Sequence, residues 1–232
     1  MTDQSVTKNH PMPTGSAEPA RAVRQRRKEA RPHELLAAAL EVFVEKGFAT
    51  SRSEEVAARA GVSKGTLYLY YPSKEELLKA VIRHYLGEEV RAGALEVARH
   101  EDAEPAVLFG VLADWWQRVY DSPASGVFKL IMTEARNFPD ISAFYLSEVI
   151  EPGSRLIGQM LERGVQRGRL RPMNIESVTH SVILPMVMLC LHKHAVGACM
   201  QLPERSFEPA QFIRDHIALV LRGVSVDDSL PK

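Results

Sequence analysis

Residues 51–78, SRSEEVAARAGVSKGTLYLYYPSKEELL, constrain the fold more than any other part of the chain. Ser51, followed three positions later by Glu54, predicts a capping box at the start of a short helix. Gly61 predicts the end of that helix, because glycine tolerates the left-handed conformation found there. A second short helix follows and ends before Pro72. Helices this short need neighbours to be stable. A helix, a glycine-containing turn and a second helix together are typical of helix-turn-helix DNA-binding domains.

The second helix, residues 64–71, carries different chemistry on its two sides. At about 100° per residue, Leu67 and Tyr71 share the side that faces a core, and Leu69 lies opposite them. The remaining positions give the outer side a cation, a hydroxyl, a small residue and two flanking phenols: Lys64, Thr66, Gly65, Tyr68 and Tyr70. Cations and phenols suit phosphates, whereas a threonine and a leucine suit base edges and thymine methyl groups. The alternative is a surface helix whose tyrosines only pack, which leaves an exposed leucine without a partner.

Two segments carry a family resemblance: LLAAALEVFVEKGF at residues 35–48 and VAARAGVSKGTLYLYYPSKEEL at residues 56–77. Together they resemble the N-terminal domain of the tetracycline-repressor (TetR) family. The resemblance implies an all-α bacterial transcription factor, cytoplasmic and nucleoid-associated. It also implies a homodimer, usually a repressor, that binds a palindromic operator and is released by a small ligand.

By position, the resemblance places Lys64, Gly65, Thr66, Tyr68, Leu69 and Tyr70 against DNA, and Lys74 against a phosphate. We also count Ser51, at the start of the first short helix, among the DNA-binding residues. Three positions depart from the family pattern: Leu69 replaces a polar or aromatic residue, Tyr71 replaces phenylalanine, and Glu54 stands where arginine is frequent. Because of Leu69, the operator sequence cannot be inferred from the family pattern, and Glu54 removes a phosphate contact.

A basic segment, RAVRQRRKEAR at residues 21–31, precedes this unit and holds six basic residues against one acidic, although the whole chain has 29 of each. It is either a solvated tail or an arm that follows DNA through Arg26, Arg27 and Lys28. Pro32 predicts the start of the first helix. We expect a disordered basic extension at residues 1–28, the helix-turn-helix domain at 29–89 with its motif at about 52–71, a helical ligand-binding and dimerisation domain at 90–225, and a tail at 226–232.

Beyond residue 100 the pattern is helical throughout, without strand alternation. A helix starting at Ser73 is expected to run toward His100 and join the two domains. A long helix after Pro139 should kink or break at Pro152-Gly153. Residues 134–168 also resemble the ligand-binding domains of a subset of the same family.

A mostly apolar ligand pocket is expected between residues 104 and 165, where aromatic and flexible apolar side chains concentrate. The candidate lining residues are Phe109, Leu112, Trp115, Trp116, Phe128 and Met132, and the candidate polar groups are Asp114, Gln117 and Glu134. Adjacent tryptophans differ by about 100° on a helix, so one is expected to line a cavity while the other packs. In the alternative, both are ordinary core or interface residues.

Two helices, at about residues 175–197 and 207–223, are expected to form the homodimer interface. The first is apolar without interruption from Ile183 to Leu191, and a helix that is apolar all round must be covered all round. A second subunit would supply that cover. In the alternative, this helix is simply central in its own domain.

Several kinds of chemistry are not expected. Cys190 and Cys199 are too few for a disulfide framework and fit a reducing compartment. His192 is turned by about 160° from Cys190 and His194 on a helix, so these residues do not form a metal site. We expect no signal peptide, membrane span, cofactor or catalytic site. The rival interpretations are a helical small-molecule-binding bundle or enzyme with only loose nucleic-acid binding, a TetR-type activator, and a regulator controlled by a partner protein.

Overall fold

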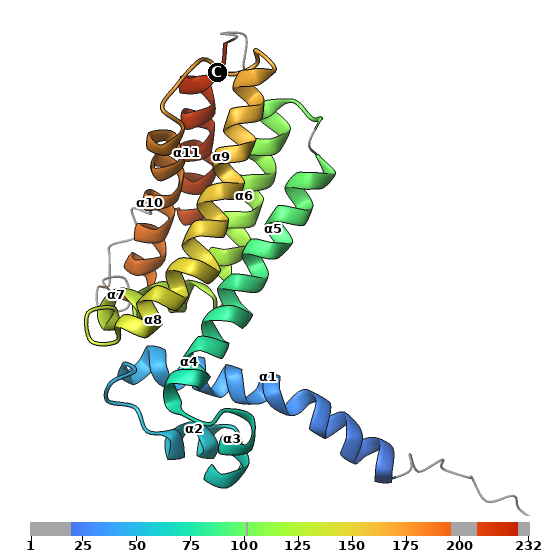
Figure 1. Cartoon of the computed structure of the whole chain (residues 1–232), viewed down its shortest axis with the longest axis vertical. Coiled ribbons are helices and arrows are strands. Elements are labelled where there is room, and N and C mark those ends of the chain that lie inside the picture. The colour runs from blue at the N-terminus through green and yellow to red at the C-terminus, as the bar shows by residue number, and fades with distance from the viewer. Residues whose placement is uncertain (1–19, 101, 196–207, 227–232) are drawn as a thin grey trace, which may run out of the picture.

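The computed structural model describes residues 20–100, 102–195 and 208–226, with side chains from residue 30 onward (Figure 1). Over these ranges every named element is helical, and the only strand-like pairing is an isolated bridge between Leu170 and Ser225. The all-α expectation is therefore confirmed. The division into domains at residues 28, 89 and 225 stays a prediction. The disorder expected at residues 1–19 and the tail expected at residues 227–232 lie outside the described residues.

The N-terminal unit consists of α1 (Ala20–Lys46), α2 (Ser53–Arg59), α3 (Lys64–Tyr70) and α4 (Lys74–Ile82). Buried apolar side chains of all four helices meet in its core: Leu35, Phe43, Phe48, Val56, Leu67 and Leu78. Gly47 and Gly61 end α1 and α2 with φ of 84° and 65°, the left-handed conformation in which glycine is least strained. The short helices thus depend on α1 and α4 for burial, as predicted.

Two local predictions in this unit are wrong. The first helix begins at Ala20 and includes Pro32, so the backbone of the basic segment is helical. The cap of α2 is Arg52, whose backbone N–H donates to the carboxylate of Glu55 at 2.9 Å. Ser51 is buried, and its hydroxyl donates to the carbonyl of Phe48 at 2.8 Å, because it closes the turn that precedes α2.

The C-terminal unit is a bundle of α5 (Glu88–Arg99), α6 (Pro105–Asp121), α7 (Ser125–Glu134), α8 (Pro139–Tyr145), α9 (Glu151–Gln166), α10 (Ile175–His194) and α11 (Pro209–Val224). A π-helical turn, η1 (Arg83–Gly87), joins α4 to α5, and a second, η2 (Leu146–Ile150), joins α8 to α9. Figure 1 shows α4 leading from the N-terminal unit directly into α5 along the bundle. The predicted helix from Ser73 toward His100 is therefore confirmed, with one wide turn inside it.

The irregularity expected at Pro152-Gly153 is the π-helical turn η2, which lies directly before Pro152. Proline lacks the N–H that an α-helix needs at that position, and a π-turn changes the hydrogen-bond spacing ahead of it. The chain consequently passes from α8 into α9 without a break.

Helix α10 packs on α7, α9 and α11. Within the described chain it is long and apolar enough to cross a membrane by length and composition, with a mean hydropathy of 1.4 over an 18-residue stretch of its 20 residues. Interior helices of water-exposed bundles share these two properties, so they carry little weight alone.

Candidate nucleic-acid interface and ligand cavity

Helix α3 presents the outer face that its sequence predicts. Leu67 is fully buried, whereas Leu69, on the opposite side, is 84% exposed. Lys64, Gly65 and Tyr68 are also exposed. The hydroxyl of Ser63 accepts a hydrogen bond from the backbone N–H of Thr66 at 3.1 Å and so caps the helix. The helix is thus held in place by its inner leucine and its cap, and its outer side chains point away from the core.

Lys64 forms an ion pair with Glu54 across the turn between α3 and α2. The hydrogen bond from Lys64 lowers the pKa of the Glu54 carboxyl, and the same contact raises the pKa of Lys64. Glu54 stands where an arginine is frequent in the family, so the position lacks a cation. It also binds a cation of the candidate reading helix and places a negative charge beside it.

The turn between α1 and α2 is held from two sides. The buried carboxylate of Glu134 on α7 accepts hydrogen bonds from the backbone N–H groups of Phe48 and Ala49, at 3.0 and 3.2 Å. The ammonium of Lys74 on α4 donates to the carbonyls of Phe48 at 2.8 Å, Ser51 at 3.0 Å and Ala49 at 3.4 Å. The observed contacts of Lys74 are thus internal, and its phosphate contact stays a prediction.

Helix α7 connects this turn to the interior of the bundle. Its Lys129 donates to the carbonyl of Val44 on α1 at 3.1 Å, close to the contact that Glu134 makes with the turn. On its other side, Phe128 reaches a cavity in the C-terminal unit. Sequence reasoning placed Glu134 in the ligand pocket and missed this contact. An acidic residue at the end of an otherwise apolar helix was the available signal.

The basic residues Arg26, Arg27 and Lys28 lie within α1. Their side chains are outside the described part of the structure, so an arm along DNA stays a prediction.

The C-terminal unit contains a cavity of about 60 Å³, lined by helices α5 to α10 and by the turns η1 and η2. Four predicted residues line it: Leu112, Trp115, Trp116 and Phe128. None of the side chains that line it is charged. Both tryptophans reach the cavity, so the expectation that one would only pack is wrong.

Two predicted lining residues lie elsewhere. Phe109 is on the same face of α6 as Trp116 but seven positions earlier, about 10 Å along the helix, beyond the end of the cavity. There it packs near Met160 and Leu170. Met132 is exposed on the outside of α7. Both errors have one cause. The sequence predicts which face of a helix is apolar, but it does not predict where along that face a cavity lies.

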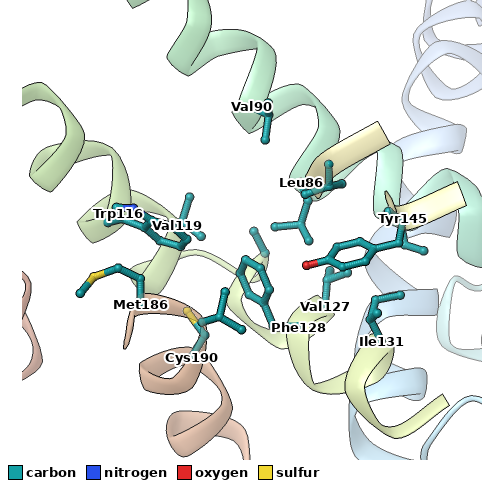
Figure 2. Close-up of a cluster of buried hydrophobic side chains, with 14 of the residues drawn as sticks. Leu86, Val90, Trp116, Val119, Val127, Phe128, Ile131, Tyr145, Met186 and Cys190 are labelled. Carbon is teal, nitrogen blue, oxygen red and sulfur yellow. The ribbon is translucent and has the colours of Figure 1, made fainter. Parts of the chain in front are cut away.

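None of the polar groups proposed for the pocket lines it. Asp114 is exposed, the Gln117 amide donates to Asp121 at 2.7 Å, and Glu134 binds the turn between α1 and α2. The side-chain polar atoms at the cavity belong instead to Ser154 and to three aromatic residues. Trp115 donates through Nε1 to the carbonyl of Glu89 at 2.9 Å, and Tyr145 and Trp116 also line the void (Figure 2).

Helices α10 and α11 have a second apolar side that faces outward. Val182, Met186 and Cys190 are buried, while Leu184 and Met188 on α10 are 59% and 63% exposed. Leu219 on α11 is 61% exposed. Among the described residues, part of the apolar run that was expected to need cover thus remains exposed.

Metal-ligating residues do not cluster in the part of the chain that the structure describes, where no group of three or more His, Cys, Asp or Glu side chains could hold an ion. Cys190 is buried, and burial raises the pKa of its thiol to about 12. Cys199 lies outside the described residues. His194 instead pairs with the Ser125 hydroxyl, 2.8 Å from its Nε2 atom.

Comparison with known sequences assigns both parts of the chain. The pattern described as "Bacterial regulatory proteins, tetR family" matches residues 35–81. The pattern described as "AefR-like transcriptional repressor, C-terminal domain" matches residues 106–221, which is half of the chain.

Relatives and a solved structure agree with these matches. The uncharacterized HTH-type transcriptional regulator YfiR of Bacillus subtilis is 28% identical over 152 residues, covering 65% of this chain and 73% of YfiR. The HTH-type transcriptional activator FasR of Mycolicibacterium smegmatis is 44% identical over 59 residues, 25% of this chain and 27% of FasR. The fold matches that of NalD, the secondary repressor of the MexAB-OprM multidrug efflux pump in Pseudomonas aeruginosa, with a TM-score of 0.61, 20% identity, and coverage of 86% and 98%.

Proposed function

Because this chain belongs to the TetR family of bacterial regulatory proteins and is a DNA-binding transcriptional regulator, we propose that it is a homodimeric, cytoplasmic repressor. It binds a palindromic operator through α3 and is released by a small, mostly apolar ligand that enters the cavity of the C-terminal unit. The repressor description of the matched C-terminal pattern supports the direction of regulation.

The observation that carries the proposal is the continuous path from cavity to reading helix. Leu86 in η1 and Val90 in α5 line the cavity, and α4 begins the same helical element beside α3. A ligand changes DNA binding only if it prefers one arrangement of the reading helices over another. The helical element that begins after the turn following α3 and lines the cavity is the means by which such a preference can reach α3.

DNA reading follows from the outer face of α3. Leu69 and Thr66 are the candidates for base contacts, and Lys64, Tyr68 and Tyr70 for phosphate contacts. Gly65 allows close approach of the backbone. Ser51 and Lys74 support the fold of the unit through the turn between α1 and α2, and their DNA contacts remain part of this proposal.

Dimerisation follows from the exposed apolar side of α10 and α11. Leu184, Met188 and Leu219 give a second copy an apolar surface, and a two-fold dimer reads an operator of two-fold symmetry. Val187, by contrast, is buried and lines the cavity. Arginine at Val187 is therefore expected to disrupt the fold, and arginine at Met188 to disrupt the dimer.

A TetR-type activator is the second candidate, because FasR, a relative over 59 residues, is described as an activator. Transcription from the bound operator in a purified system separates the two candidates. The repressor lowers transcript yield when bound, and the activator raises it.

The proposal is tested by selecting bound duplexes from a random library and measuring their affinities. Wild-type protein is expected to select an inverted repeat. Thr66→Ala and Leu69→Ala should each relax base preference by ~1–3 kcal/mol per lost contact. Thr133→Ala and Leu95→Ala replace exposed residues of the same types outside the N-terminal unit and serve as matched controls. Equal losses on selected and random duplexes would show loose nucleic-acid binding instead.

The dimer is tested by analytical ultracentrifugation, with about twice the 25.9 kDa chain mass expected. Met188→Arg and Leu184→Arg should give folded monomers with weakened operator binding. Leu95→Arg places the same charge on an exposed leucine of α5 and should leave the dimer intact. A wild-type monomer at micromolar concentration contradicts the proposal.

A further inference from the structure

The wall of the cavity restricts the charge of any ligand that enters it. Its side chains are aliphatic and aromatic apart from the hydroxyls of Tyr145 and Ser154 and the two indole N–H groups. A buried ionised group is strongly disfavoured without a partner of opposite charge, and no lining residue offers one. The cavity therefore favours a ligand that is uncharged where it is buried.

Two polar atoms in this wall have no partner. The Tyr145 hydroxyl and the Trp116 Nε1 atom are fully buried and make no hydrogen bond within the described structure. Their residues are only 5% and 4% exposed. Most buried polar groups in folded proteins are paired, because an unpaired one loses its hydrogen bonds to water without replacement. Both atoms therefore point to a missing partner.

The missing partner must accept hydrogen bonds. An indole N–H is a donor only. Burial raises the pKa of Tyr145, so its hydroxyl keeps its proton and remains able to donate. Figure 2 shows that hydroxyl directed inward toward Phe128, with Trp116 on the far side of the same ring. Trp115 makes a useful contrast, because its Nε1 is already satisfied by the carbonyl of Glu89.

We propose that the ligand of this cavity is a neutral, mainly apolar molecule with at least one uncharged oxygen acceptor, such as a ketone, ester or amide. The Tyr145 hydroxyl binds that oxygen, the Trp116 N–H is a second donor on the other side of Phe128, and the aliphatic and aromatic wall binds the remainder. This inference rests on the proposed function in one respect, since it takes the cavity to be the effector site. A bridging water is the alternative partner, but it needs two to four polar neighbours, and the wall offers few.

The inference is tested by titration calorimetry on the full chain with three probes that share a phenyl group and a three-carbon chain. Propiophenone carries a ketone, propylbenzene has no acceptor, and 3-phenylpropanoate is an anion. Propiophenone should bind ~3- to 10-fold more tightly than propylbenzene, the size of one net hydrogen bond. The anion should bind most weakly. Equal or tighter binding of propylbenzene or of the anion, or no binding of the ketone, overturns the inference.

Variants of the two donor residues test which of them causes the preference for the ketone over propylbenzene. Tyr145→Phe should lose most of the ketone preference while its affinity for propylbenzene is retained, and Trp116→Phe should lose part of it. Tyr120→Phe changes a tyrosine of α6 that does not line the cavity, and it should behave as wild type. A full ketone preference in both Tyr145→Phe and Trp116→Phe contradicts the inference. Circular dichroism checks that each variant is folded. If only one of them folds, a full ketone preference in that variant contradicts the inference.

Failure of the ligand class is distinguishable from failure of the proposed function. Ketone-selective binding that leaves operator affinity unchanged would uphold the ligand class and contradict release from DNA. Release of the operator by propylbenzene or the anion in preference to the ketone would uphold release and overturn the ligand class.

Discussion

The outer face of α3 and the cavity of the bundle differ in how their residues are brought together. Lys64, Thr66 and Leu69 lie within two turns of one helix, and their exposure follows from the burial of Leu67. The cavity takes its wall from six helices and two π-helical turns, and its polar atoms sit on residues far apart in the chain, such as Trp116 and Tyr145. The first site depends on local periodicity and the second on the packing of many elements.

The two sites also differ in charge. The reading face carries Lys64, which Glu54 pairs, and the cavity has no charged side chain in its wall. Binding at α3 is therefore expected to depend strongly on salt, and binding in the cavity hardly at all. Helix α7 lies between them, with Phe128 at the cavity and Glu134 at the turn before α2.

The largest effect is expected from breaking that connection. Glu134→Ala leaves the buried N–H of Phe48 without its acceptor and should lower the free energy of unfolding by ~2–3 kcal/mol. Glu134→Gln keeps an oxygen acceptor, so its free energy of unfolding should fall by less. The measurement is urea unfolding followed by circular dichroism, with Glu162→Ala on the exposed side of α9 as the control. A Glu134→Ala protein as stable as this control would show that the contact does not hold the two units together.

A smaller effect, on DNA affinity, is expected from making the reading face of α3 more positive. Glu54→Gln releases Lys64 and removes a negative charge that faces the phosphates. Affinity should rise several-fold on operator and random duplex alike, with a steeper dependence on salt, because counterion release does not depend on sequence. Fluorescence anisotropy at several salt concentrations measures both quantities. Glu75→Gln, an exposed acid in the first turn of α4, is the matched control. An unchanged salt dependence would mean that Lys64 reaches no phosphate.

The smallest effect concerns the end of α10. Burial, followed by the nearby charges of Lys193 and Lys129, lowers the pKa of His194. The unfolded chain then takes up its proton at a higher pH than the folded one, near the ordinary histidine value of about 6.5. Stability that is present above that pH is lost as pH falls through it toward the folded value.

The loss in melting temperature between pH 7 and pH 5 should therefore be smaller in His194→Gln, which keeps a side chain able to bond Ser125. His180→Gln changes an exposed histidine on the same helix, and its melting temperature should fall between pH 7 and pH 5 by as much as that of the wild type. If both variants respond to pH alike, His194 does not contribute.

The sequence predicted the parts of the molecule whose determinants are local. Leu67 and Leu69 were assigned to opposite sides of α3 from periodicity alone, and Gly61 marked the end of α2. The wall of the cavity was predicted only in part. Phe109 lies on the right face of α6 but beyond the void, and Met132 lies on the outside of α7.

The remaining errors have physical causes that no local pattern contains. Glu134 is an acidic residue in a helix, and its role depends on two N–H groups more than eighty positions earlier in the chain. Tyr145 becomes part of the cavity only because α8 and η2 pack against η1 and α7. Long-range packing decides such contacts, and one sequence shows only the residues that take part.

The most direct test of the account joins the two sites in one measurement. Anisotropy of a labelled, selected operator is recorded with wild-type protein while propiophenone is added, at the salt concentration used for calorimetry. We expect operator affinity to fall by about 5- to 150-fold, the usual range of allosteric coupling, with half of the effect near the calorimetric dissociation constant. Saturation of the cavity in calorimetry without any change in operator affinity would contradict the account.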